Sequence, residues 1–134
     1  MAKIKAIIEK SEDGGYSVYA IDVQGAAGYG ETDTEAKTDF LSVLEEQAEY
    51  YTERTGKIAE WAKDGYEIEY RYDFSGFFQA FPFVNISAFA EMVGINPSLM
   101  RKYKAGLATA SEKQKQQIQG EFDKIVHRLQ AVQF

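Results

Sequence analysis

Alternation of polar and apolar residues marks four stretches of the first half as β-strands. The pattern is clearest at residues 66–73, where three tyrosines and an isoleucine alternate with charged residues. Residues 3–10 alternate in the same way, and residues 12–15 (EDGG) have the composition of a tight hairpin turn. Residues 16–22 and the glycine-rich residues 25–31 complete a meander. We therefore predict one antiparallel sheet of about four strands.

Between residues 32 and 56 the apolar spacing changes to that of a helix. Thr32 is placed to cap this helix, Glu35 completes a capping box, and Gly56 marks the end. One stripe is apolar apart from a single glutamine: Ala36, Phe40, Leu44, Gln47 and Tyr51. The opposite face carries four carboxylates: Glu45, Glu46, Glu49 and Glu53. This acidic face is either a solvated surface or a docking surface for a basic partner.

After the fourth strand the pattern is helical throughout. The phenylalanines around Pro82 predict a short helix that packs under the helices that follow it. Residues 86–93 and 97–105 predict two more helices separated by a glycine-led turn, with Asn85 or Ser87 capping the first. A last helix follows Ser111, and its apolar residues recur every three or four positions: Ile118, Phe122, Ile125, Leu129 and Val132.

These patterns predict an α+β protein of two domains. Residues 1–73 form the sheet with its one long helix, and residues 74–134 form an all-α domain. The charge divides at the same place: residues 1–73 carry 8 Lys and Arg against 17 Asp and Glu, a net charge of −9, whereas residues 74–134 carry 7 against 4, a net charge of +3. A basic half suits phosphate, and an acidic half suits a basic partner.

The composition removes several classes of function. The chain has no cysteine, which excludes disulfides and thiolate chemistry, and its single histidine, His127, is interpreted as a surface residue. No nucleotide loop is present, and we expect no cofactor and no metal. Three carboxylates, Glu9, Asp22 and Asp33, are too few and too scattered for a catalytic site, so we expect no enzyme. The amino-terminal residues predict a strand rather than a signal peptide, and no stretch approaches the ~20 apolar residues of a membrane span. We expect a cytoplasmic protein that does not enter a membrane.

The two helices at residues 86–105 and the helix after them have the pattern of a helix-turn-helix. Five residues fit the core positions of that motif: Phe89, Ala90, Ile95, Met100 and Tyr103. Six others are expected to face outward: Asn96, Ser98, Leu99, Arg101, Lys102 and Lys104. All of these except Leu99 are expected to contact DNA. Amide and hydroxyl groups can contact base edges, and Arg and Lys can contact phosphate or guanine. The alternative is an ordinary helical hairpin with a solvated basic face.

Two segments resemble known families. ISAFAEMVGINPSLMRKYKAG resembles the repressor-type helix-turn-helix, in which G-I-x-P-x precedes a basic recognition helix that ends at glycine. IIEKSEDGGYSVYAIDVQGAAGYGETDTEAKTDF resembles the HicB-type antitoxin domain. The match is carried by Glu9, Asp13, Gly14, Gly15, Tyr16, Asp22, Gly25, Gly30, Thr32, Glu35 and Ala36. That family joins such a domain to a carboxy-terminal DNA-binding module.

The HicB resemblance implies a partial ribonuclease-H-like domain that binds and masks a small basic toxin ribonuclease, together with repression of its own operon. It does not imply catalysis. On this hypothesis the acidic face with Glu45, Glu46, Glu49 and Glu53 meets the toxin, and the helical domain binds double-stranded operator DNA as a homodimer or higher homo-oligomer. The alternatives are an orphan helix-turn-helix regulator whose first domain only dimerises or senses a ligand, and a nuclease.

Overall fold

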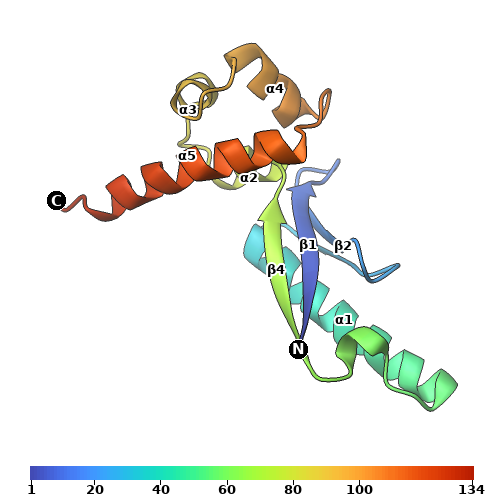
Figure 1. Ribbon diagram of the computed structural model, residues 1–134. Coiled ribbons are helices and arrows are strands. Elements are labelled where there is room, and N and C mark those ends of the chain that lie inside the picture. Colours follow the sequence, from blue (N-terminus) through green and yellow to red (C-terminus); the bar gives the residue numbers. More distant parts are fainter. The chain divides into compact units, whose positions relative to one another are not determined.

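The computed structural model describes residues 1–134 and divides into two compact units, Met1–Ala80 and Phe81–Phe134 (Figure 1). The first unit combines a four-stranded sheet with helices, and the second is built from helices alone. The predicted α+β class is confirmed. None of the helices is both long enough and apolar enough to cross a membrane.

The sheet contains every strand that the alternation predicts. Its strands are β1 (Ala2–Lys10), β2 (Tyr16–Ala20), β3 (Ala27–Gly30) and β4 (Tyr66–Tyr72), in the order β3-β2-β1-β4. At the hairpin between β1 and β2, the Ser11 N–H donates to the Gly15 carbonyl over 2.8 Å, and Gly14 adopts a φ of +96°. A positive φ is a conformation that glycine adopts without strain, as the turn composition predicted.

The expectation of an antiparallel sheet is wrong for one strand pair. β1 is antiparallel to β2, and β2 to β3, but β4 runs parallel to β1 with Ile4 opposite Ile68 and Ile8 opposite Tyr72. The sheet is therefore mixed. The reason is the connection: the chain leaves β3, crosses through the long helix α1 (Asp33–Thr55) and the short 3-10 helix η1 (Glu60–Ala62), and returns in the direction of β1.

The core of the first unit lies between α1 and one face of the sheet. Ala36, Phe40 and Leu44 of α1 are buried against the inward residues of the strands, among them Ile4 and Val18. The helix comes closest to β3, where a Cβ added to Gly28 would lie 2.5 Å from the Phe40 nitrogen. The glycine-rich segment is thus the place where a helix backbone lies directly on a strand.

The helix α2 (Phe74–Ala80) belongs to the first unit, which ends at Ala80 rather than at Asp73. Gln79 Nε2 donates to the carbonyls of Gly14 and Gly15 over 3.2 and 3.0 Å, and the Lys10 N–H donates to Ser75 Oγ over 3.1 Å. These contacts fasten α2 to the end of β1 and to the hairpin turn.

The second unit contains the three remaining helices, α3 (Ile86–Met92), α4 (Pro97–Ala105) and α5 (Glu112–Gln130). Each begins at a polar cap, as the sequence indicates. Asn85 accepts from the Ala88 N–H and Ser111 accepts from the Gln114 N–H. Phe89 of α3 meets Phe122 of α5 edge-on, with 6.1 Å between the ring centroids.

Candidate functional site

The turn between α3 and α4 is held by backbone and side-chain hydrogen bonds. Gly94 adopts a φ of +78°, and the Ile95 N–H reaches back to the Ala90 carbonyl over 2.8 Å. Asn96 then caps α4 by accepting from the Ser98 N–H over 2.8 Å, and Pro97 occupies the first helical position. α4 ends at Gly106, which has a φ of +75°. The turn therefore fixes where the outer face of α4 points relative to α3.

All five residues assigned to the core of this helix pair are buried: Phe89, Ala90, Ile95, Met100 and Tyr103. The five residues expected to contact DNA are all exposed: Asn96, Ser98, Arg101, Lys102 and Lys104. Leu99, which was also expected to face outward, is half-buried. At about 100° per residue, Ser98, Arg101 and Lys102 lie on the side of α4 opposite Met100 and Tyr103, with Lys104 at its edge. The helix pair thus presents three cations on one exposed helix that has no acidic residue.

Two details of this surface were not evident from the sequence. Arg101 Nη1 donates to the Ser87 hydroxyl over 3.1 Å, which ties the outer face of α4 to the start of α3. Nothing in the local pattern predicts this contact, because it joins residues 14 positions apart across the turn. The second is that the side-chain oxygen of Asn96 accepts the Ser98 N–H as a helix cap, whereas its amide nitrogen remains free to donate to a ligand.

The four glutamates of α1 lie together on one exposed face. Glu45, Glu46, Glu49 and Glu53 are all exposed, and none of them forms an ion pair within the chain. The helical repeat places them opposite the buried Phe40 and Leu44. Tyr50 is 62% exposed beside this face, and Arg54 lies over its ring at 5.5 Å from the centroid. The acidic face is therefore a surface of uncompensated negative charge next to an exposed aromatic ring.

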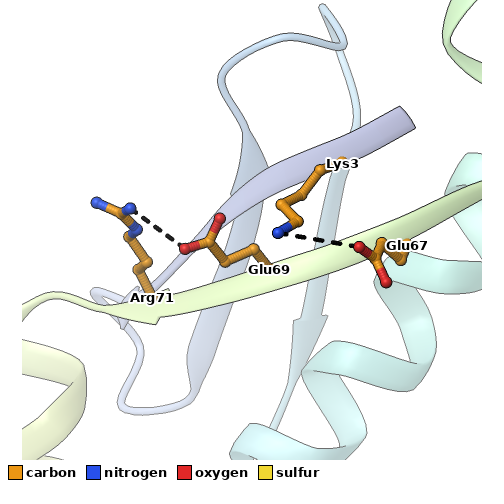
Figure 2. A network of polar contacts seen from close by, with 4 residues as sticks. All are labelled: Lys3, Glu67, Glu69 and Arg71. Carbon is orange, nitrogen blue, oxygen red and sulfur yellow. Dashed lines mark hydrogen bonds and ion pairs between the residues drawn. The ribbon is translucent and has the colours of Figure 1, made fainter. Parts of the chain in front are cut away.

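The second exposed surface of the first unit is the face of the sheet that α1 does not cover. Along β1 and β4 it carries two ion pairs, Lys3–Glu67 at 3.9 Å and Glu69–Arg71 at 3.2 Å (Figure 2). Their side chains are well exposed, so they contribute little to stability. Beside them, Ile7 lies opposite Tyr19, whose side chain is 38% exposed. The open face thus offers aromatic and apolar area bordered by charge.

The carboxylates considered for catalysis lie apart. Glu9 is on the open face, where burial and then the charge of Asp73 raise its pKa. Asp73 in turn caps α2, because its Oδ1 accepts from the Gly76 N–H over 2.8 Å. Asp33 lies on the α1 side of the sheet and accepts from the Tyr72 hydroxyl, and Asp22 follows β2. No group of three or more His, Asp or Glu side chains is placed to hold a metal ion.

Comparisons with known proteins give one partial match. The chain is 43% identical over 44 residues to the UPF0150 protein ssl0738 of Synechocystis sp.. The matched segment covers 33% of this chain and 61% of that protein. The chain therefore spans about three fifths of the relative that it matches. UPF0150 is a HicB-related family, and the similarity agrees loosely with a HicB-like protein. No family model and no solved structure matches the chain.

Proposed function

We propose that this protein is a HicB-like antitoxin and transcriptional regulator. In this proposal the first unit binds and silences a small basic ribonuclease, and the second binds operator DNA through α4. The observation that carries the proposal is the separation of two opposite charged faces: four unpaired glutamates on α1, and three exposed cations on α4 in a different unit. The partial similarity to a HicB-related family supports it.

The DNA-binding half of the proposal is supported by the geometry of the helix pair. A helix that enters the major groove needs a buried inner face and an outer face of polar and basic side chains. α4 has both, with Met100 and Tyr103 inward and Ser98, Arg101 and Lys102 outward. Lys102 and Lys104 supply charge for phosphates, and the amide nitrogen of Asn96 and the Ser98 hydroxyl supply hydrogen bonds to base edges.

The partner-binding half is supported by the acidic face and by the open face of the sheet. Charge complementarity speeds the encounter of two proteins, whereas most of the affinity comes from buried apolar and aromatic groups. In this proposal the encounter with a basic partner is accelerated by the acidic face with Glu45, Glu46, Glu49 and Glu53. The apolar and aromatic contacts that give affinity are available at Tyr50 beside this face, or at Ile7 and Tyr19 on the sheet.

The experiment that tests the antitoxin function uses the protein encoded beside this gene. If that neighbour is a small basic ribonuclease, we expect it to degrade RNA when it is assayed by itself. We expect the degradation to stop when an equimolar amount of this chain is added. The same chain should shift DNA from upstream of its own gene in a gel. A neighbour without nuclease activity, or one that this chain leaves active, would remove the antitoxin function.

The second candidate is an orphan regulator that binds DNA and has no toxin partner. The observation in its favour is that the basic surface and its supporting core lie wholly within the second unit. A surface built in this way does not depend on the acidic unit. DNA binding without any effect on the neighbouring protein would therefore favour this candidate.

A further inference from the structure

The three cations on the exposed side of α4 differ in how they are held. Arg101 Nη1 donates to the Ser87 hydroxyl over 3.1 Å, and no carboxylate pairs with Arg101. The ammonium groups of Lys102 and Lys104 form neither a hydrogen bond nor an ion pair within the chain. The arginine is therefore held in one direction before any ligand arrives, whereas no side chain fixes the two lysines.

Ser87 is itself well positioned to hold another side chain. It lies in the first turn of α3, whose start is fixed because Asn85 Oδ1 accepts from the Ala88 N–H over 2.9 Å. Phe89, two residues farther along, is buried in the core of the unit, and Ser87 is half-buried. A short side chain on a capped and packed helix has few orientations. The hydroxyl group therefore gives the guanidinium a defined point of attachment.

The hydrogen bond to Ser87 leaves most of the guanidinium available. Arginine carries five N–H donors in a rigid planar fork, and only Nη1 is used here. Nε and Nη2 together present two parallel donors, which match the N7 and O6 acceptors of guanine in the major groove. The bond lies at the surface and adds little to stability, but it orders a long side chain before binding. Binding then pays less of that ordering entropy.

We propose that Arg101 recognises a guanine in the major groove and that Ser87 is the residue that positions it. Lys102 and Lys104, which are point charges on flexible stems, contact phosphates and carry no sequence preference. The inference rests on the proposed DNA binding of the second unit. It goes further by assigning one base to one side chain, and by giving a specificity role to a serine outside α4.

The first test measures which base pair Arg101 recognises. The full chain is titrated by anisotropy against a duplex from upstream of its own gene, and against duplexes in which each G·C pair is replaced in turn by A·T. At one pair the replacement should weaken wild-type binding by about ten-fold or more. Arg101→Lys keeps the charge and should abolish this preference while leaving the salt dependence unchanged. Lys102→Ala is the matched control, and it should reduce the salt dependence and keep the preference.

The second test separates positioning from a merely structural role for Ser87. Ser87→Ala should reduce the preference for that G·C pair several-fold, and Ser87→Thr, which keeps the hydroxyl, should retain it. In the Arg101→Lys background, Ser87→Ala should have no further effect, because the two residues act as one unit. Circular dichroism should show equal helix content in all variants.

Two outcomes would overturn the inference, and they are distinguishable. A wild-type chain that binds no DNA removes the proposed DNA binding and this inference with it. A chain that binds DNA, but in which Ser87→Ala weakens binding to every duplex by the same factor or leaves all of them unchanged, overturns this inference alone. In the first of these cases Ser87 contacts a phosphate and does not position Arg101.

Discussion

The hydroxyl of Tyr72, at the end of β4, donates to Asp33 Oδ2 at the start of α1 over 2.6 Å. Burial, followed by this hydrogen bond and the charge of Asp33, raises the pKa of Tyr72 well above its usual value of 10.0. Lys37 lies over the same ring, 5.3 Å from its centroid. One edge of the sheet is thus joined to the first turns of the helix that covers it.

This contact predicts a loss of stability at alkaline pH. Because the pKa of Tyr72 is raised in the folded state, folding favours the neutral phenol. The resulting contribution to the free energy of unfolding is complete below the unfolded-state pKa of 10.0, and it is lost as the pH rises toward the folded-state pKa. At pH 7 we expect Tyr72→Phe to cost about 1–2 kcal/mol of unfolding free energy. Urea titrations at pH 7 and pH 10.5 should show this difference shrinking. A difference that is the same at both pH values would contradict the assignment.

Two glycine-to-alanine substitutions should have opposite effects. A Cβ on Gly28 would lie 2.5 Å from the Phe40 nitrogen and 2.9 Å from the Ala36 carbonyl oxygen, and neither backbone atom can move away without shifting α1. We expect Gly28→Ala to destabilise the protein by about 1–3 kcal/mol or more. Gly120 is within α5 and has open space where its Cβ would be, so Gly120→Ala should stabilise its unit by up to about 1 kcal/mol. Thermal unfolding of both variants measures the two signs.

The sequence is sufficient for the strands of this fold but not for their partners. Alternation at Tyr66–Tyr72 correctly predicts a strand with one inward face, because side chains in a strand alternate whatever the neighbouring strand is. The direction of pairing depends on where the crossover after β3 returns, and no residue of β4 encodes that. The same limit applies to α2, whose place depends on Gln79 reaching a hairpin turn 64 residues earlier.

The surface of α4 was predictable because its signals are local. A glycine-led turn, a capping asparagine and a proline at the first helical position determine the start of the helix, and the helical repeat then separates Met100 and Tyr103 from the cations. The contact between Arg101 and Ser87 was not predictable, since it requires the angle between two helices. The capping role of Asn96 is also a matter of geometry, and it changes how that residue should be tested.

The proposed DNA contacts predict two different kinds of loss. Lys102→Ala should weaken binding to all sequences by a similar factor and reduce the slope of affinity against salt by about one unit for the lost phosphate contact.

Asn96→Ala would mix a lost cap with a lost base contact, so Asn96→Ser, which keeps the cap, is the better variant. It should reduce discrimination between specific and unrelated DNA by about 1–3 kcal/mol. Anisotropy titrations with specific and unrelated DNA at several salt concentrations measure both effects. If neither Lys102→Ala nor Asn96→Ser changes DNA binding, the proposed surface is contradicted.

The acidic face predicts the kinetics of partner binding more than its strength. Glu46 and Glu49 are exposed on α1 and have no cation within the chain, so their field extends into solvent toward a basic protein. Reversing both to lysine should slow association with the proposed ribonuclease partner by about ten-fold at low salt, with a much smaller change in dissociation. The comparison variant reverses Glu67 and Glu69, which are already paired with Lys3 and Arg71 and lie on the open sheet face, the other surface proposed to meet the partner. In stopped-flow measurements, the association rate constants of wild type and the α1 variant should converge as the salt concentration rises, because screening removes the electrostatic field that distinguishes them. If the sheet variant slows association and the α1 variant does not, the open face rather than α1 is the surface that meets the proposed partner.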